Sequence, residues 1–379
     1  SMALVLAFFI PLALSLLNQQ IYVELLPIYI KRALIFLVVS CPCALVLSIP
    51  LSYFAGIGKL SSIGVLVKSG YDLDSFSSVD AFVFDKTGTI TEGAFSVTHM
   101  YHHSKAYDVF KYAALAEYHS NHPIAKSIVK SYPHSIETSD LKNHKDIFGK
   151  GIIVSYKDKP LIAGTTDLLN EYHIQVVNPQ EVGTVVHIAY DNQYLGFIQL
   201  EDQVKQNASK TVEILKSMGK DIYLLTGDQH TVAQYVGKSL KMDHIYDQLL
   251  PTDKVRIINQ IKENKKVAFV GDGMNDAPVL ITADLGISMG LNGTDAAIES
   301  SDAVIMNDDP YQIIKAIFIS KRTKKIVFQN ITLALGVKMI VLTLSAFGLA
   351  TMWMAIFADV GISLIAVLNS MRIFKKTPR

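Results

Sequence analysis

The stretch VDAFVFDKTGT, residues 79–89, decides the fold of this chain. Residues 79–84 are mostly apolar, as in a strand that is buried on both faces, and Asp85 follows directly where that strand would end. Ligands of open α/β sheets bind beyond the carboxyl ends of the strands. The sequence therefore predicts that Asp85 stands at the binding edge of a parallel sheet.

Two more motifs follow apolar runs in the second half of the chain. TGD at residues 226–228 comes after the run 221–225, and GDGMND at residues 271–276 comes after the run 267–270. Strands that alternate with helical patterns in this way are typical of a doubly wound parallel sheet. Because the carboxyl ends of parallel strands share one edge of the sheet, we expect these motifs to meet Asp85.

Residues 92–201 interrupt this alternating pattern. Helical sequence rich in Tyr and His is followed there by apolar strands that glycines separate, at residues 149–153, 161–164, 184–190 and 194–200. We therefore expect a second, α+β domain inserted into the first.

Long apolar stretches flank this central region. Half of the 379 residues are hydrophobic and 18% are charged, fewer than the roughly 25% of an ordinary soluble domain. The stretches 3–17 and 33–51 each approach the roughly 20 residues that a membrane-spanning helix needs, and residues 330–371 provide two helices joined by a turn near residues 349–352. We expect four crossings, with both ends of the chain on one side.

Charge predicts the orientation of these helices and excludes one class of partner. Lys and Arg residues collect where the apolar stretches adjoin the central region, whereas Lys31 and Arg32 stand on the other side. The positive-inside rule then places the central region and both termini in the cytoplasm of a multi-pass protein of the cell membrane. The formal net charge of +1 shows no basic excess, so nucleic acid is excluded as a partner.

The three motifs supply the side chains that phosphoryl transfer through an aspartyl phosphate requires: a positioned carboxylate, a lysine, a hydroxyl and further carboxylates. In this interpretation Asp85 is the nucleophile and Asp272 holds Mg²⁺. Lys254 and Thr226 bind the phosphoryl oxygens. The candidate catalytic residues are Asp85, Lys86, Thr87, Thr226, Gly227, Asp228, Lys254, Asn275 and Asp276. The alternative for each motif alone is a strand-end turn, in which Asp and Gly are common.

Cys41-Pro42-Cys43 lies inside the second apolar stretch. Proline removes a helical hydrogen bond and clashes with the preceding turn, so the helix is expected to break here. The spacing is too tight for an ordinary disulfide, and thiolates are the ligands that soft metals prefer. We therefore predict a metal site at Cys41 and Cys43; the alternative is two small buried hydrophobic residues at a proline kink.

Lys338 and Asp359 are the charged residues of the last apolar region. An ionised side chain at mid-bilayer costs about 2.5–3.5 kcal/mol, which favours a functional role. Counted at about 1.5 Å per residue from the turn near residue 350, both reach the depth of Cys41 and Cys43. The four residues are predicted to form one site for a borderline divalent ion; the alternative is a structural ion pair of Lys338 with Asp359.

These motifs resemble those of a known family. DKTGT at residues 85–89, TGD at 226–228 and GDGMNDAP at 271–278, in this order, resemble the P-type ATPases, whose catalytic core has the haloacid dehalogenase-like fold. Cys41-Pro42-Cys43 and His122-Pro123 resemble the heavy-metal-transporting branch. The resemblance implies that ATP phosphorylates Asp85, that Asp272 and Asp276 complete the phosphorylation site, and that Asp85, Thr87 and Asp272 hold Mg²⁺.

The resemblance also implies binding sites for ATP and for a transported ion. The residues that match the ATP-contacting positions are Glu117, His122, Gly149, Gly151 and Gly164, and Thr165 stands where many relatives carry Asn. The Cys-Pro-Cys motif together with Lys338 and Asp359-Val360-Gly361 is similar to the exporters of Zn²⁺, Cd²⁺ and Pb²⁺. This similarity implies that one of these ions is exported through Cys41, Cys43, Lys338 and Asp359.

The resulting domain assignment is as follows: membrane helices (1–68), phosphorylation domain (69–91 and 202–322), nucleotide-binding domain (92–201), membrane helices with a basic tail (323–379). The family's actuator domain, with its Thr-Gly-Glu loop, is not found in the sequence and is expected either upstream or on another chain. A rival hypothesis is a membrane-anchored phosphatase of the same fold, which needs neither Cys41 nor Lys338. A non-enzymatic metal-binding or regulatory membrane protein is a second rival.

Overall fold

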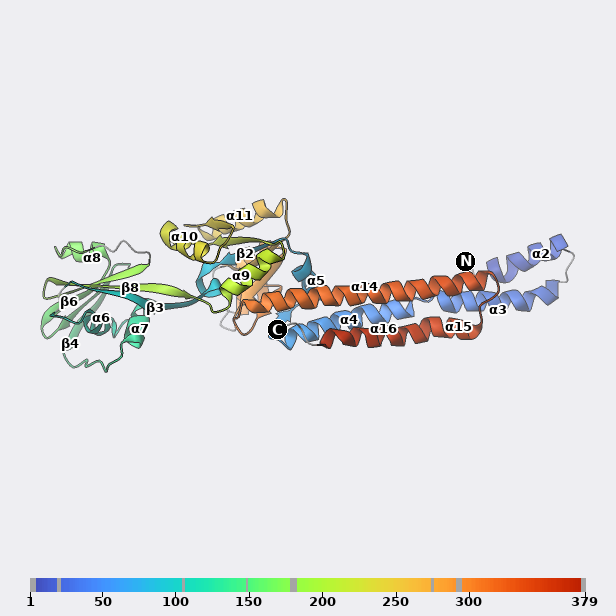
Figure 1. Cartoon of the computed structure of the whole chain (residues 1–379), viewed down its shortest axis with the longest axis horizontal. Helices are drawn as coiled ribbons and strands as arrows, with labels where there is room; N and C mark the ends of the chain where they lie inside the picture. The colour runs from blue at the N-terminus through green and yellow to red at the C-terminus, as the bar shows by residue number, and fades with distance from the viewer. Residues whose placement is uncertain are drawn as a thin grey trace. The chain divides into compact units, whose positions relative to one another are not determined.

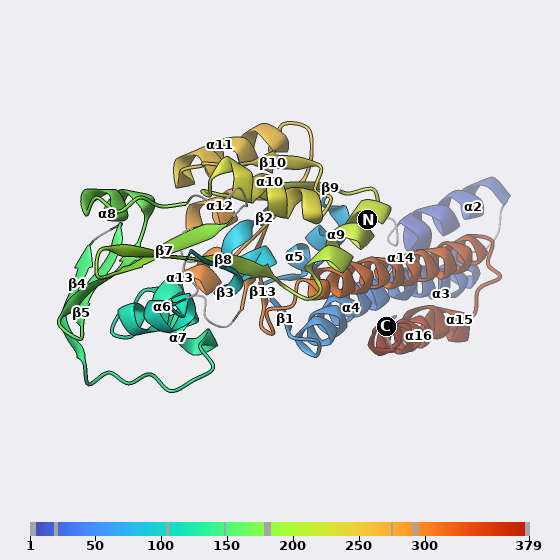
Figure 2. The same cartoon turned by 60° about the vertical axis from the view of Figure 1, so that its left-hand side comes forward.

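The computed structural model describes residues 5–18, 22–103, 106–147, 149–177, 183–273, 276–290 and 295–375. The chain divides into two compact units, shown in Figures 1 and 2. The helical unit comprises Ser1–Val79, Asp302–Met306 and Gln312–Arg379. The α/β unit comprises Asp80–Ser301 and Asn307–Tyr311.

One of the two sheets of the α/β unit is parallel in the part described here. Strand β2 (Ala81–Asp85) lies between β11 (Val267–Gly271) and β9 (Asp221–Leu225), with β12 (Leu285–Met289) beside β11 and β10 (His244–Tyr246) beside β9. Every residue of β2, β11 and β12 is buried. Burial on both faces explains why these strands read as continuous apolar runs rather than alternating ones.

Helices cover both faces of this sheet. On one face, Tyr223 and Val83 pack with Ile257 of α11 and Leu280 of α12. On the other, Gly237 of α10 packs against Leu224. The helices of this part are α9 (Ala208–Ser217), α10 (His230–Ser239), α11 (Pro251–Lys262), α12 (Ala277–Thr282) and α13 (Asp295–Ser300). The doubly wound sheet expected from the sequence is confirmed.

The inserted region forms an antiparallel sheet in the order β3-β8-β7-β6-β5-β4. Its elements are β3 (Thr91–His102), α6 (Val109–Glu117), α7 (Pro123–Ser131), β4 (Leu141–Ile147), β5 (Gly151–Tyr156), β6 (Lys159–Gly164), α8 (Thr166–Glu171), β7 (Thr184–Tyr190) and β8 (Gln193–Val204). Side chains alternate along β6: Leu161 and Ala163 pack with α6 and α7, whereas Ile162 packs with α8. Both faces of the sheet are therefore covered, and the expected α+β domain is confirmed.

The helical unit contains three segments that are long and apolar enough to cross a membrane: Val23–Ser61, Tyr311–Ala346 and Met352–Phe374. They are built from α3 (Tyr22–Ser40), α4 (Cys43–Ser61), α14 (Tyr311–Ala346), α15 (Met352–Ile356), a π-helical turn (Phe357–Gly361), α16 (Ile362–Ser370) and a 3₁₀ turn (Met371–Phe374). The unit also contains α5 (Gly70–Ser78) and the antiparallel strands β1 (Val65–Val67) and β13 (Ala303–Ile305).

Two expectations for this unit differ from the structure. The first predicted crossing, residues 3–17, appears as a shorter apolar helix, Ala7–Leu16, so the described residues provide three full-length segments rather than four. The second predicted stretch, residues 33–51, covers only the middle of Val23–Ser61, because the neighbouring turns continue as helix on both sides. The domain boundaries expected from the sequence stay predictions.

Helices α4, α14 and α16 lie side by side in both views (Figures 1 and 2). Ala44, Ala334 and Ile362 form one apolar cluster between them. At Gly56, a Cβ atom would lie 2.7 Å from Thr323 Oγ1, so only glycine allows α4 this close to α14. The small residues fix the spacing of the bundle.

Candidate functional site

The first candidate site lies at the carboxyl ends of β2, β9 and β11. Asp85 ends β2 and pairs in register with Leu225, the last residue of β9. The residues that follow, beginning at Thr226 on β9 and Asp272 on β11, therefore leave the sheet at the same edge. A Cβ atom on Gly88 would lie 3.3 Å from Asp272 Oδ2, which places the Asp272 carboxylate against the loop after Asp85.

Lys254 bridges two carboxylates in this edge. Its Nζ donates to Asp85 Oδ1 at 2.6 Å and to Asp276 Oδ1 at 2.8 Å, and all three side chains are buried. Asp276 is held at this position because it is the residue just before α12, whereas Lys254 projects from α11. The structure thus brings together Asp85, Lys254 and Asp276 from three separate parts of the sequence.

Burial is the main influence on the titration of Asp85. Burial and repulsion by the Asp276 carboxylate raise the pKa of Asp85 to about 7, although Lys254 acts in the opposite direction. Burial alone would lower the pKa of Lys254, but its two carboxylate partners outweigh it and raise the pKa. The lysine therefore stays charged, whereas burial disfavours the ionised form of Asp85.

The carboxylates of this edge fit a magnesium ion. Asp272 and Asp276 both raise the pKa of Asp85 through repulsion, so the site holds more negative charge than Lys254 neutralises. Carboxylate oxygens are the ligands that Mg²⁺ prefers, and a divalent cation would relieve this repulsion. Asp85 and Asp272 would hold the ion, with Thr87 exposed in the adjoining loop.

The other predicted catalytic residues surround this group. Lys86 forms an ion pair with Asp228, and Thr226 Oγ1 accepts a hydrogen bond from the Asp228 backbone N–H at 3.1 Å. Gly227 follows Thr226 in a turn that Tyr246 also holds, since its carbonyl accepts from the Thr226 N–H at 3.0 Å. Asn275 lies outside the described residues.

Sequence reasoning missed Lys205. Its Nζ is buried and donates to the Gly88 carbonyl at 2.7 Å and to Asp308 Oδ1 at 2.8 Å. Lys205 thereby holds the backbone of the DKTGT loop at Gly88. The sequence shows only a single lysine directly after the last strand of the inserted domain. Nothing in the sequence indicates that its side chain is buried.

The second candidate site is a cavity of about 750 Å³ in the inserted domain. All five residues predicted to contact ATP line it: Glu117, His122, Gly149, Gly151 and Gly164. Thr165 and Asp146 also line it, and Asp146 had no motif to indicate it. The structure thus gathers residues from α6, α7, β5 and β6 around one space of the size that a ligand requires.

Glu117 and His122 have defined local roles in this cavity. Burial, followed by repulsion from Asp146, raises the pKa of Glu117 to about 8, so its carboxyl is mostly protonated at neutral pH. His122 caps helix α7: its Nδ1 accepts a hydrogen bond from the Ile124 N–H at 3.3 Å. His122 therefore both caps α7 and lines the cavity.

Gly151 and Gly164 are paired across β5 and β6. Gly151 has φ +141°, and a Cβ atom there would overlap the Ala163 carbonyl and the Gly164 Cα. A Cβ on Gly164 would overlap the Lys150 carbonyl in the same way. The backbones therefore approach so closely that the cavity floor tolerates no side chain at either position.

We expect Gly151→Ala to destabilise the inserted domain by about 2 kcal/mol or more and to abolish nucleotide binding, because the strands must separate. Gly149→Ala is the matched control. Gly149 also has a positive φ, +70°, but open space surrounds it, so only about 1–2 kcal/mol of backbone strain is expected. Thermal unfolding and binding of fluorescent ATP measure both effects; equal losses in the two variants would contradict the steric explanation.

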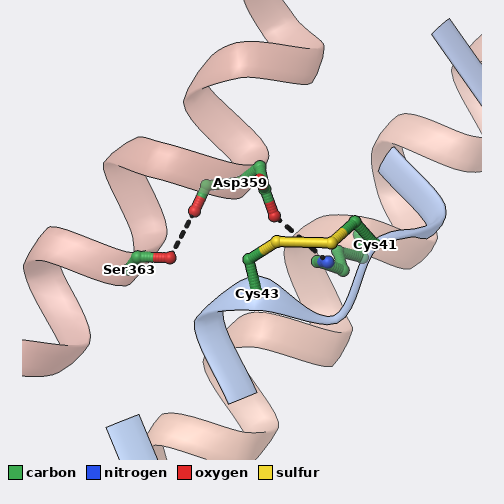
Figure 3. Close-up of a disulfide and its surroundings, with 5 residues drawn as sticks. Cys41, Cys43, Asp359 and Ser363 are labelled. Carbon is green, nitrogen blue, oxygen red and sulfur yellow. Dashed lines mark hydrogen bonds and ion pairs between the residues drawn. A yellow bond between two sulfur atoms is a disulfide. The ribbon is translucent and has the colours of Figure 1, made fainter. Parts of the chain in front are cut away.

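The third candidate site lies where α3 and α4 are separated. The break expected at Pro42 is present, with α3 ending at Ser40 and α4 beginning at Cys43. The expectation that the spacing excludes a disulfide was wrong: Cys41 and Cys43 are bonded to each other (Figure 3). The broken helix holds their Cα atoms 5.6 Å apart, which lies within the range of ordinary disulfides.

Asp359 faces the two cysteines. One carboxylate oxygen of Asp359 and the two sulfur atoms lie within 4.8 Å of one another, and Lys338 Nζ stands 3.5 Å from Asp359 Oδ1. The hydroxyl of Ser363 donates to the Asp359 carbonyl at 2.6 Å (Figure 3). Asp359 belongs to the π-helical turn Phe357–Gly361, a type of turn that is frequent at functional sites. The structure thus brings all four predicted residues together.

Comparison with known proteins is consistent with these three sites. The model of the haloacid dehalogenase-like hydrolases matches residues 79–284, which include the Asp85 edge and the inserted domain. The chain belongs to the haloacid dehalogenase-like hydrolases. All residues of the Asp85 edge described above lie within the range that this hydrolase family model matches.

Relatives of this hydrolase chain include metal transporters. It is 45% identical over 386 residues to the cadmium, zinc and cobalt-transporting ATPase of Bacillus subtilis, covering 98% of the chain and 53% of the relative. It is 45% identical over 353 residues to the zinc-transporting ATPase of Synechocystis sp., covering 92% and 49%. The chain spans about half the length of these curated relatives.

A solved structure supports the same grouping. The hydrolase chain matches the crystal structure of a zinc-transporting PIB-type ATPase in the E2.Pi state with a TM-score of 0.84 and 29% identity, over 99% of the chain and 61% of that protein. The resemblance to heavy-metal-transporting P-type ATPases is thereby confirmed. With its three long apolar segments, the chain is a membrane protein whose catalytic domains are cytoplasmic.

Proposed function

We propose that the chain is the catalytic and membrane core of an ATP-driven exporter of a divalent metal ion. The observation that carries this proposal is the coexistence of two sites: Asp85 with Lys254 at a sheet edge, and Cys41, Cys43 and Asp359 among apolar helices. A phosphatase needs the first site alone. The second places two cysteines and a carboxylate together among apolar helices, which a phosphatase does not require.

In this proposal Asp85 is the nucleophile. Its ionised carboxylate attacks the γ-phosphorus of ATP, and the bond from that phosphorus to the β,γ-bridging oxygen breaks, so that ADP leaves and Asp85 carries the phosphoryl group. Lys254 neutralises charge at the attacking oxygen, and Thr226 offers a hydroxyl to the phosphoryl group. Asp85, Thr87 and Asp272 would hold Mg²⁺, which would supply further charge neutralisation.

The nucleotide in this proposal occupies the cavity of the inserted domain. Gly149, Gly151 and Gly164 let backbone approach the ligand, and the protonated Glu117 can donate a hydrogen bond to it. His122 is already oriented by its cap on α7. The actuator domain and its Thr-Gly-Glu loop stay a prediction from the resemblance.

The transported ion binds at Cys41, Cys43 and Asp359 once the sulfurs are reduced thiolates. Two thiolates and one carboxylate suit a borderline divalent ion, and the relatives are named for cadmium, zinc and cobalt. Lys338 pairs with Asp359 while the ion is absent. We propose Zn²⁺, Cd²⁺ or Co²⁺ as the substrate, with Pb²⁺ as a further ion of the same coordination chemistry.

Phosphorylation from labelled ATP tests this function. Purified, reduced chain with Mg²⁺ and γ-labelled ATP is expected to form an acid-stable phosphoprotein only when Zn²⁺, Cd²⁺ or Co²⁺ is present, and Cys43→Ser is expected to lose this dependence. Labelling that is the same with a chelator as with the metal would favour the membrane-anchored phosphatase. Stimulation by Cu⁺ alone would contradict the choice of a divalent ion.

A further inference from the structure

A groove of about 530 Å³ lies between α14 and α16, near the end of the bundle where basic residues collect. Its lining consists of Gln329, Leu333, Ile365, Leu368, Asn369 and Arg372. Leucine and isoleucine form one end and polar side chains form the other. None of the three candidate sites described above uses these residues.

The apolar end of the groove faces lipid chains. Leu333, Ile365 and Leu368 are exposed, and they belong to the segments that are long and apolar enough to cross a membrane. Exposed apolar residues at this depth contact acyl chains rather than water. This end of the groove is therefore suited to a hydrocarbon chain.

The polar end carries positive charge. Arg372 follows α16, lines this end of the groove and is exposed. Within the residues that the structure describes, Arg372 has no carboxylate partner. Basic pockets between membrane helices on the cytoplasmic side attract anionic headgroups, and a guanidinium binds phosphate through two parallel hydrogen bonds.

Arg372 is held by a hydrogen-bonded chain that reaches the core of the bundle. Its Nη1 donates to Asn369 Oδ1 at 2.7 Å, and Asn369 Nδ2 donates to Asn330 Oδ1 at 2.9 Å. Asn330 is fully buried, and its own Nδ2 donates to Ser370 Oγ at 3.1 Å. The guanidinium is therefore positioned in advance, unlike a lysine on a flexible surface, and less entropy is lost when a phosphate binds.

We propose that this groove is a binding site for an anionic phospholipid, with the phosphate on Arg372 and an acyl chain along Leu333, Ile365 and Leu368. The proposal is independent of metal export, because it rests on residues that belong neither to the metal site nor to the Asp85 edge. The lipid joins the two helices at the level of Asn330.

Native mass spectrometry of the full chain in non-ionic detergent tests the site. Phosphatidylglycerol is expected to bind the first site more tightly than phosphatidylcholine, and water-soluble glycerol phosphate is expected not to compete. Competition by glycerol phosphate would show a free-anion site and overturn the lipid assignment. Equal binding of the two phospholipids would overturn the role of charge.

Two variants and a control locate the site. Arg372→Gln is expected to weaken the first phosphatidylglycerol by about tenfold or more, as for a lost hydrogen bond to a charged group. Leu368→Trp fills the groove without changing charge and is expected to prevent binding. Lys324→Gln removes a nearby charge outside the groove and is expected to change binding by less than about twofold. Wild-type binding in both groove variants, or equal losses in Arg372→Gln and Lys324→Gln, would overturn the proposal.

Discussion

Asp85→Asn is expected to reduce incorporation of phosphate from γ-labelled ATP by about 10⁴-fold or more, as for removal of a catalytic nucleophile. The amide is a poor nucleophile and cannot form an acyl phosphate. The substitution keeps the side-chain shape, and the amide oxygen still accepts from Lys254. It also removes a buried negative charge beside Asp276, so the fold is not expected to lose stability.

Acid-stable labelling and thermal unfolding of the same preparations measure this effect. Asp158→Asn is the matched control, because Asp158 is 81% exposed and forms a salt bridge with Lys142 in the inserted domain. The control is expected to label like the original chain. If Asp85→Asn labels normally, the nucleophile lies elsewhere; if both variants fail, the loss does not report on Asp85.

Reduction of the Cys41–Cys43 disulfide is expected to switch metal binding on. In the disulfide each sulfur is bonded to the other and offers no thiolate, whereas two thiolates and Asp359 would place three ligand atoms within the 4.8 Å that the structure records. A phosphine reductant takes up one oxygen from water and leaves two thiols. We expect the oxidised chain to bind no Zn²⁺ at this site and the reduced chain to bind one ion.

Calorimetric titration of oxidised and reduced protein with Zn²⁺ measures the difference. Cys41→Ser and Cys43→Ser are expected to weaken binding by at least about 100-fold, since even residues that only hydrogen-bond to a metal ligand contribute about 10–100-fold. Ser40→Ala is the control: its hydroxyl donates to the Phe36 carbonyl, one residue from Cys41 but outside the ligand set. Equal affinity of the oxidised and reduced chains would exclude the cysteines as ligands.

The Asp85 edge could be predicted because its geometry follows from topology. Parallel strands end at one edge, so Asp85, Thr226 and Asp272 had to converge once their preceding runs were identified as strands. Helical rise predicted the meeting of Lys338 with Asp359 in the same way. Helices and strands have a fixed rise per residue, so the spacing of two residues in the sequence predicts how far apart they lie along the element.

Other features depend on tertiary contacts that the spacing of residues in the sequence does not predict. Lys205 reaches the Gly88 carbonyl only because the chain leaves β8 beside the DKTGT loop. Asp146 lines the cavity of the inserted domain from β4, whose sequence carries no motif. The disulfide was misjudged because the spacing rule assumes regular backbone, and the break at Pro42 changes the direction of the chain between the two cysteines.

The two longest membrane segments differ in mechanical stiffness. Helix α14 runs unbroken through 36 residues, a rod of about 54 Å at 1.5 Å per residue. A displacement of one end of α14 is therefore transmitted to Lys338 as a tilt or a translation of the whole helix. The segment that carries the cysteines has a joint at Pro42 instead, so its halves can swing while the rod beside them stays straight.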